Sequence, residues 1–278
     1  MIYREFTPHP CLRPFIECYW KASADSPPFR KEESLIPDGT IELMFNFGDD
    51  YDQVREGMRA PVKGSHIIGI RKKTLQISQT RRQEVFSVRF RPGGTYPFFR
   101  IPVHLFANAF WNITELLGKA YYELEEQLFG ARDDAERIHI IDSFLLSRME
   151  TGDDYRFVSS CSRWILEHSG ASIADTCRTF GTHYKNLERK FSQVIGLTPT
   201  ELLKIRRFNS AILAMYSKPE ASLTDIAYSC GFYDQSHFIR EFKQLSGYTP
   251  KAFLKAGFTI VRVIQPALAD RVSKSYNL

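Results

Sequence analysis

Residues 221–255 read ASLTDIAYSCGFYDQSHFIREFKQLSGYTPKAFLK, and this stretch decides the fold because an earlier stretch closely resembles it. Residues 171–199, ASIADTCRTFGTHYKNLERKFSQVIGLTP, keep the same order of apolar residues, glycine and a final Thr-Pro. The offset between the copies is 50 residues up to the glycines and 51 residues from Phe191 and Phe242 onward. Because a repeat with one local insertion rarely arises by chance, the sequence predicts two copies of one structural unit.

Each copy has the pattern of a helix-turn-helix unit. Both open on Ser-x-x-Asp, at 172–175 and 222–225, where the serine hydroxyl can accept from free backbone N–H groups of a first helical turn. The first helix is only about two turns long and ends at a glycine, the residue that adopts a left-handed backbone most easily. A second helix is predicted to follow at once, over residues 183–194 and 234–245.

The spacer between the two units predicts one long, buried helix. Pro199 suits its first turn, and the helix should end near Ser217-Lys218-Pro219. About 18 residues at 1.5 Å each give a rod of roughly 27 Å. Such a rod can hold two reading helices about one duplex turn apart, roughly 34 Å. The apolar positions that should bury it are Leu202, Leu203, Ile205, Phe208, Ile212, Leu213 and Met215.

The second helix of each unit leaves a polar and cationic face beside its inward apolar positions. Arg can pair with guanine, and Asn and Gln with adenine, in the major groove. Glu188 is acidic, so it should accept from cytosine N4 or pair with Arg189 or Lys185. Any single residue here also fits a solvated surface, but the repeat favours base reading. The predicted base contacts are His183, Lys185, Asn186, Glu188, Arg189, Gln235, Ser236, His237 and Arg240.

Backbone phosphates need cations that position the protein without reading sequence. Residues 154–258 hold 14 Lys and Arg against 9 Asp and Glu, a net charge of +5 that equals the formal net charge of the whole chain. This concentration of positive charge is typical of a surface that meets phosphate. The predicted phosphate contacts are Lys190, Lys204, Arg206, Arg207, Lys243 and Lys251.

The N-terminal part of the chain predicts β-structure. Residues 40–47 and 86–91 alternate apolar and other side chains, and Ile68 and Ile70 indicate a further strand. Short strands with Pro and Gly punctuation, as at 92–94, favour a small antiparallel barrel or sandwich. The fold class is therefore α+β, with an N-terminal antiparallel β-barrel that carries helices and a C-terminal all-α domain.

Helical periodicity begins after Trp111. One helix should run from a cap at Asn112 through Leu128, and a second from about Asp133 to Met149. This pair either packs on its own barrel, which we favour, or forms a dimer surface. Expected units are a β-barrel-like sensor domain over 1–130, a helical linker over 131–153, a double helix-turn-helix domain over 154–257 and a tail over 258–278. Within the tail, Thr259–Ile264 either adds a strand or is loose.

Several other classes of protein lack support in the sequence. Five scattered cysteines give neither a disulfide framework nor a zinc cluster, and no two histidines and a glutamate share a strand. No glycine-rich phosphate loop or nucleophile elbow is present. The N-terminus has no signal peptide, and no apolar run spans a membrane. We expect a cytoplasmic protein that is not an enzyme, with no metal, no cofactor and no membrane partner.

The two units resemble the AraC/XylS family of bacterial transcription regulators. Residues 221–255 are similar to the signature segment of that family, and residues 171–207 to its more variable half. The resemblance implies double-stranded DNA and RNA polymerase as partners and a homodimer as one assembly. It maps base contacts here to Lys185, Glu188, Arg189, Gln235, Ser236, His237 and Arg240.

The N-terminal half resembles, less specifically, the cupin-like sensor domains fused to such regulators, through LIPDGTIELMFNF and VRFRPGGTYPFF. A small-molecule effector is the ligand that such a domain implies. Polar residues opposite the apolar strand faces either line an effector pocket or face water, and the second reading is slightly favoured. These residues are Glu42, Ser87, Arg89 and Arg91.

Overall fold

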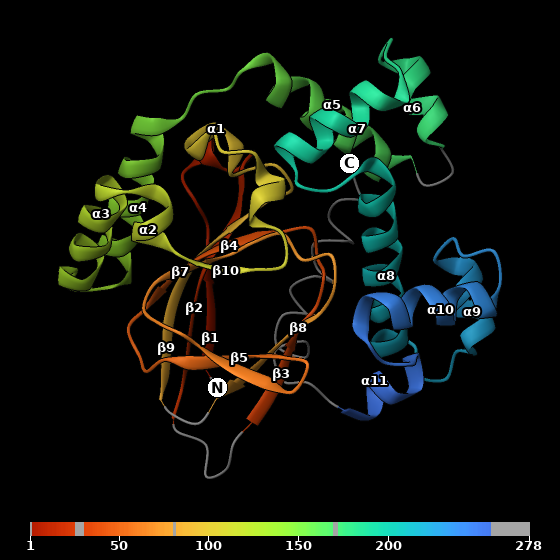
Figure 1. The fold of residues 1–278 in the computed structure, drawn as a ribbon, viewed down its shortest axis with the longest axis horizontal. Coiled ribbons are helices and arrows are strands. Elements are labelled where there is room, and N and C mark those ends of the chain that lie inside the picture. Colours follow the sequence, from red (N-terminus) through yellow and green to blue (C-terminus); the bar gives the residue numbers. More distant parts are fainter. Residues whose placement is uncertain (1, 26–30, 80–81, 169–171, 257–278) are drawn as a thin grey trace.

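A computed structural model describes residues 2–25, 31–79, 82–168 and 172–256 of the protein (Figure 1). A β domain occupies the N-terminal half, and a helical domain follows it in the chain and lies against one side of it. Within the described residues, no helix combines the length and the apolar character that a membrane crossing requires.

Ten strands of the described residues form two antiparallel sheets. The six-stranded sheet has the order β1-β2-β9-β4-β7-β10, and the four-stranded sheet the order β3-β8-β5-β6. Their bounds are β1 Ile2–Phe6, β2 Ile16–Ala24, β3 Lys31–Leu35, β4 Ile41–Asn46, β5 Tyr51–Arg55, β6 Met58–Val62, β7 His66–Ile68, β8 Leu75–Gln79, β9 Gln83–Phe90 and β10 Phe110–Asn112. The strands predicted around 40–47, 68–70 and 86–91 are β4, β7 and β9.

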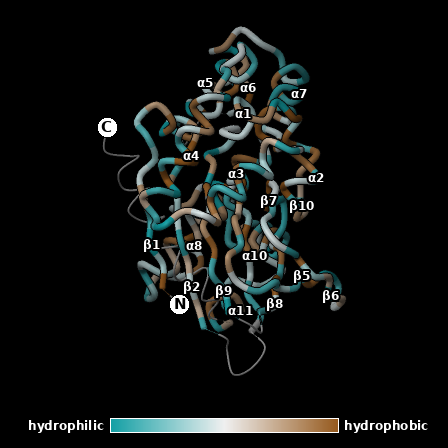
Figure 2. The backbone as a smooth tube through the Cα atoms, turned by 90° about the vertical axis from the view of Figure 1, so that its left-hand side faces the viewer, coloured by the Kyte–Doolittle hydropathy of each residue, from teal (hydrophilic) through white to brown (hydrophobic). Residues whose placement is uncertain are grey.

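The predicted barrel is not closed. Between described strands, the backbone ladders stay within each sheet and none joins one sheet to the other. The four-stranded sheet instead lies across one face of the larger sheet, and its β5–β6 hairpin projects from the body of the molecule (Figure 2). The antiparallel character of the prediction is confirmed, and its closure is wrong.

The two faces of the six-stranded sheet bury different chemistry. One face carries Leu43, Phe45, Val88 and Phe90 into the main apolar core. The other face, toward the smaller sheet, buries a second cluster around Trp20 together with polar side chains. This division follows from the two-residue period of strands, which sends alternate residues to opposite faces.

Short helices and a helical pair cover the apolar face of this sheet. The pair packs on its own β domain, as favoured from the sequence: Tyr121, Leu124, Ile141 and Leu145 join the main core. The helix predicted over 112–128 is broken at Gly118, whose backbone has φ 77° and ψ −168°. Bounds are η1 Pro10–Leu12, α1 Tyr96–Phe99, η2 Val103–Phe106, α2 Ile113–Leu117, α3 Lys119–Gly130 and α4 Asp134–Arg148.

The C-terminal domain contains seven described helices, and its long central helix carries one group of helices near each end (Figure 1). The bounds are α5 Asp153–Glu167, α6 Ile173–Thr179, α7 Tyr184–Val194, α8 Pro199–Ser217, α9 Leu223–Ser229, α10 Gln235–Ser246 and α11 Pro250–Ala256. The segment Thr259–Ile264, for which a strand was one expectation, lies outside the described residues.

The two groups of helices dock on the β domain in different ways. The group around α7 shares one continuous apolar core with the β domain, a core that includes Ile70 and Val103 of the β domain and Val194 and Ile195 of this group. The group around α10 has its own apolar core, to which the β domain contributes Ile36. Polar contacts therefore make a larger contribution to holding the α10 group on the β domain than they do for the α7 group.

Candidate nucleic-acid interface

The first helix-turn-helix unit consists of α6 and α7. Ser172 and Asp175 form a complete capping box at the start of α6, as the Ser-x-x-Asp pattern predicts. Hydrogen bonds from Ser172, together with Arg178, lower the pKa of Asp175 to about 2. Gly181 follows the helix with φ 58°, in the left-handed region that favours glycine. His183 then caps α7, its ring Nδ1 accepting from the backbone N–H of Asn186.

The second unit, α9 and α10, repeats this construction. Ser222 accepts from the backbone N–H of Asp225, and Gly231 has φ 78° after α9. Asp234 caps α10 by accepting from the backbone N–H of His237 at 2.6 Å. The rings of Phe232 and Phe238 pack against each other, with centroids 5.0 Å apart and planes tilted by 52°. Both predicted helix-turn-helix units are therefore present.

Helix α8 is the long helix that the sequence predicts between the two units, and it acts as a strut that holds them apart. Its 19 residues give a length of about 28 Å. Thr198 and Glu201 form a capping box at its start, and Glu201 also accepts from Lys72 Nζ of the β domain at 3.0 Å. Toward its other end, Phe208 packs on Phe242 of α10 with centroids 4.9 Å apart. The strut is thus fixed both to the β domain and to the second unit.

On α7 the predicted base-contacting residues are all at least partly exposed. His183, Lys185 and Arg189 are exposed, whereas Asn186 and Glu188 are half-buried. Asn186 donates to Thr182 and accepts from Arg189 Nη2 at 3.1 Å. Glu188 accepts from the hydroxyl of Tyr184 at 3.2 Å, so its described partner is neither of the two cations considered from the sequence.

On α10 some of the predicted base-contacting side chains have no hydrogen-bond partner among the described residues, and others have polar partners within the domain. Ser236 and Arg240 are exposed, and neither has a hydrogen-bond partner among the described residues. Gln235 is exposed but accepts from Thr224 of α9 at 2.8 Å. His237 is half-buried, and its Nε2 lies 3.4 Å from Glu241. The assignment of all nine residues to base contacts stays a prediction.

Glu241 connects the recognition helix of the second unit to the strut. Its carboxylate is buried and accepts from Arg207 Nη2 of α8 through both oxygens at 3.0 Å. His237 Nδ1 accepts from the backbone of Tyr233, which leaves Nε2 protonated and directed at the same carboxylate in the neutral ring. This chain of three side chains sets the orientation of α10 on α8.

The predicted phosphate contacts occupy varied environments. Lys243 and Lys251 are exposed, and Lys204 is half-buried. Lys190 pairs with Asp154 of α5. Arg206 Nη1 donates to the backbone carbonyls of Ile165 and Leu166, at the end of α5, at 3.2 and 3.0 Å. With the pairing of Arg207, three of the six cations hold helices of the domain together, and phosphate contact remains a prediction for all six.

Exposed tyrosines were missed from the sequence. Tyr233, two residues before α10, has 84% of its surface exposed, and Tyr228 of α9 and Tyr184 of α7 are also exposed. The signal lay in their neighbours: Phe232 is committed to the core and Asp234 to the cap, so the residue between them must point outward.

Each recognition helix docks its C-terminal end on the β domain. Gln193, near the end of α7, donates to Tyr96 at 2.8 Å. At the end of α10, Thr74 donates through both its backbone N–H and its hydroxyl to the carbonyl of Leu245, at 2.9 and 3.0 Å. The N-terminal halves, which read base edges in helix-turn-helix proteins, include exposed Lys185 and Ser236.

Three of the four proposed effector residues, Glu42, Ser87 and Arg89, come together, and Arg91 lies apart from them. Arg91 is exposed and donates to the carbonyl of Arg13. Glu42, Ser87 and Arg89 are buried, so the slightly favoured reading, that they face water, is wrong for these three. It fails because the four-stranded sheet covers this face of β4 and β9.

These three residues form a buried polar network with Trp20. Glu42 accepts from Arg89 Nε at 2.6 Å, and from Trp20 Nε1 and Ser87 Oγ at 2.8 Å each. Such bonding satisfies a buried carboxylate, which is otherwise costly to remove from water. Arg89 Nη1 has no hydrogen-bond partner among the described residues. Their role as effector ligands stays a prediction.

The environments of a buried thiol and of the potential metal ligands can be described directly. Burial raises the pKa of the Cys161 thiol to about 12, which keeps it protonated and unreactive. In the part of the chain that the structure describes, no group of three or more His, Cys, Asp or Glu side chains is placed to hold a metal ion.

Comparison with known proteins matches the two halves to different families. Residues 4–112 match a domain of unknown function (DUF6597), and residues 176–256 match a helix-turn-helix domain. The HTH-type transcriptional activator RhaS of Escherichia coli O1:K1 is 38% identical over 94 residues, 32% of this chain and 32% of that protein. RhaS of Escherichia coli strain SE11 is 33% identical over 91 residues, again 32% of each chain. The C-terminal domain belongs to the AraC/XylS family.

The match to these curated relatives spans about a third of their length, within the AraC/XylS domain. The solved structures to which the chain is similar include ToxT from Vibrio cholerae, with a TM-score of 0.44 at 14% identity, covering 83% of this chain and 98% of that one. A structure of ToxT bound to (E)-4-(8-methylnaphthalen-1-yl)but-3-enoic acid has a TM-score of 0.45 at 12% identity, covering 91% and 98%.

Proposed function

We propose that the protein is a sequence-specific DNA-binding regulator of transcription. One recognition helix from each unit, α7 and α10, enters one of two successive major grooves. The observation that carries this proposal is the pairing of two capped helix-turn-helix units on one rigid helix, with the N-terminal half of each recognition helix left accessible. The relatives named above, which carry the same type of domain, are transcriptional activators by name.

The chemistry of the two faces supports a division of labour. Arg189 and Arg240 present guanidinium groups that suit guanine, and Gln235 an amide that suits adenine. Lys243 and Lys251 present exposed ammonium groups for phosphate. Specificity then comes from the first set and general affinity from the second.

The β domain is proposed to modulate DNA binding, through a small-molecule effector or through a homodimer. It contacts the C-terminal ends of both recognition helices, so a change in its structure reaches them directly. RNA polymerase is the partner that a regulator bound near a promoter would engage. The proposed function also requires a cytoplasmic location, where bacterial DNA lies.

A gel-shift experiment tests the proposal. The full chain is titrated onto the duplex upstream of its own coding sequence, with an excess of unrelated duplex as competitor. We expect a retarded band that persists in the competitor and is lost when the upstream duplex itself is added unlabelled. A band that both competitors remove equally would contradict sequence-specific binding.

A further inference from the structure

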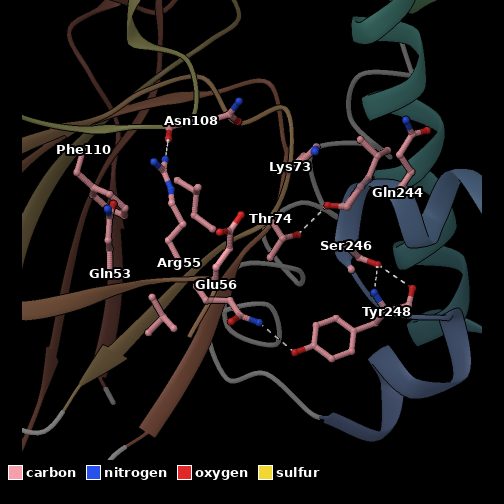
Figure 3. A pocket seen from close by; sticks show the side chains of 15 residues that line it. Gln53, Arg55, Glu56, Lys73, Thr74, Asn108, Phe110, Gln244, Ser246 and Tyr248 are labelled. Carbon is pink, nitrogen blue, oxygen red and sulfur yellow. Dashed lines mark hydrogen bonds between the residues drawn. The ribbon is translucent and has the colours of Figure 1, made fainter. Parts of the chain in front are cut away.

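A groove of 740 Å³ lies between the β domain and the second helix-turn-helix unit (Figure 3). One wall comes from β5 and β8, the two inner strands of the four-stranded sheet, with Asn108 and Phe110. The other wall comes from the end of α10 and the turn before α11, through Gln244 and Tyr248. Its volume falls within the roughly 300–1,000 Å³ that small-molecule sites occupy.

Direct hydrogen bonds between the domains cross this groove. Thr74 donates to the carbonyl of Leu245, and Gln76 Nε2 donates to the hydroxyl of Tyr248 at 3.1 Å (Figure 3). The single hydroxyl proton of Ser246 is taken up within the helical domain, because the carbonyls of Phe242 and Tyr248 lie 2.7 and 2.9 Å from Oγ, and Oγ also accepts from the backbone N–H of Tyr248. These groups hold the walls together and leave other polar side chains to meet a ligand.

The polar groups of the groove that take no part in these interdomain hydrogen bonds are mostly hydrogen-bond donors. Gln53, Lys73 and Gln244 line the groove and have no hydrogen-bond partner among the described residues. Arg55 uses one nitrogen on the carbonyl of Asn108 at 3.1 Å, and its other donors remain available. Against these two cations the lining holds one acid, Glu56. The groove therefore favours an anion.

The amides narrow the class of anion further. Each amide offers two donors and one acceptor, which suits a hydroxyl that both donates and accepts. Gln53 and Gln244 place such amides on opposite walls, and Val54, Leu75 and Phe110 provide apolar surface for a carbon skeleton. A carboxylate or phosphate carried on a hydroxylated carbon chain matches all of these groups.

We propose that this groove is a binding site for a small hydroxylated anion, a sugar acid or a sugar phosphate, that bridges the β domain and the second helix-turn-helix unit. The second unit is held on the β domain mainly by polar contacts. A ligand that bridges the two would therefore contribute a large part of the interaction between them. A ligand that touches both walls binds the docked arrangement better than any separated one, and it shifts the population toward docking.

Binding of the ligand in the groove should be coupled to binding of DNA, an inference that rests on the proposed function. The ligand contacts the C-terminal end of α10, whose N-terminal half is the proposed base-reading surface. If the ligand changes DNA affinity by some factor, DNA must change ligand affinity by the same factor.

Isothermal titration of the full chain tests the site with gluconate, glucose 6-phosphate and uncharged glucose as probes. We expect saturable binding of at least one anion and binding of glucose weaker by about tenfold or more, since a charge-assisted hydrogen bond is lost. Gluconate alone would assign a carboxylate, and glucose 6-phosphate alone a phosphate. Absence of saturable binding for both anions at millimolar concentration would overturn the proposal.

Variants on both walls check the location. Lys73→Gln in the β domain and Gln244→Ala in α10 should each weaken anion binding about tenfold, with melting temperatures unchanged. Lys63→Gln, at an exposed lysine outside the groove, is the matched control and should bind as the wild type does. Equal weakening by Lys63→Gln and Lys73→Gln would show general charge attraction and overturn the site.

DNA binding is measured on the same preparations, so the two proposals fail separately. A chain that retards its upstream duplex but binds neither anion refutes the groove alone. A chain that binds an anion through Lys73 and Gln244 but shows no specific retardation refutes the DNA-binding function alone.

Discussion

At the scale of single residues, His66 shows how burial determines charge. Its ring lies between the two sheets, where Nδ1 donates to the carbonyl of Gly64 at 2.9 Å and Nε2 accepts from the hydroxyl of Tyr51 at 2.7 Å. The carbonyl can only accept, so Nδ1 carries the proton of the neutral ring. Burial lowers the pKa of His66 from 6.5 to about 4.

This shift predicts a specific acid sensitivity. As pH falls from 6.5 toward 4, the unfolded chain protonates at His66 while the folded chain does not, so the free energy of unfolding falls by up to about 3 kcal/mol. Urea unfolding across this pH range should show a slope that His66→Gln reduces. His9→Gln, at an exposed histidine, should keep the wild-type slope, and a His66→Gln slope equal to wild type would contradict the assignment.

A second residue-scale prediction separates base reading from phosphate binding. Arg240→Ala should cost about 1–3 kcal/mol on the specific duplex and relax preference at one base pair. Lys243→Ala, three residues further along α10 and also exposed, should weaken specific and random duplexes alike and lower the salt slope by about one. Fluorescence anisotropy at several salt concentrations measures both, and identical behaviour of the two variants would refute the assignment.

At the scale of elements, the turn after α7 decides how the first unit meets the β domain. Gly196 has φ 83°, and a Cβ there would lie 2.8 Å from Val103 and 2.9 Å from Ile70. Two demands therefore select glycine at this position: the left-handed backbone, and the close approach of the β domain. Gly247, after α10, has φ 81°, but a Cβ added there would meet no described atom within 4 Å, so it meets only the first demand.

The pair of glycines gives a controlled measurement of interdomain packing. Gly247→Ala should lower the free energy of unfolding by about 1 kcal/mol, the cost of a left-handed alanine. Gly196→Ala should cost about 1–3 kcal/mol more, because it also overpacks the interface with Val103 and Ile70. Chemical denaturation measures both, and equal losses would mean that the interface yields without cost.

At the scale of the whole molecule, α8 sets the distance between the two recognition helices. Its apolar side and its contacts with Glu241 and Lys72 leave it little freedom to bend. In Figure 1, α7 lies near one end of α8 and α10 near the other. A duplex bound by both units must therefore present its two half-sites at one fixed spacing.

Spacing variants of the bound duplex test this rigidity. Inserting about 5 bp between the half-sites turns one away from the protein by half a helical turn, and about 10 bp restores the face but adds roughly 34 Å. With a rigid strut both insertions should reduce affinity at least about tenfold, toward binding by one unit. Recovery at the longer insertion would indicate a flexible connection, and no loss at either would indicate that a single unit binds.

The elements that could be predicted from sequence are those whose signals are local. The repeat, the serine caps, Gly181 and Gly231 specified both helix-turn-helix units, and Pro199 specified the start of α8, because caps and left-handed turns depend on residues within a few positions of one another. Alternation gave the strands for the same reason. The break at Gly118 was missed because an apolar stripe continues past it.

The features that depend on tertiary contacts involve partners far apart in the chain. Alternation placed Glu42 and Arg89 opposite the apolar face, but whether that face meets water or a second sheet depends on how the two sheets stack. Likewise the exposed-looking Arg207 is committed to Glu241, 34 positions away, and the groove beside α10 exists only where β8 meets it. Local spacing determines backbone conformation, whereas burial and charge pairing are set by which distant surfaces come together.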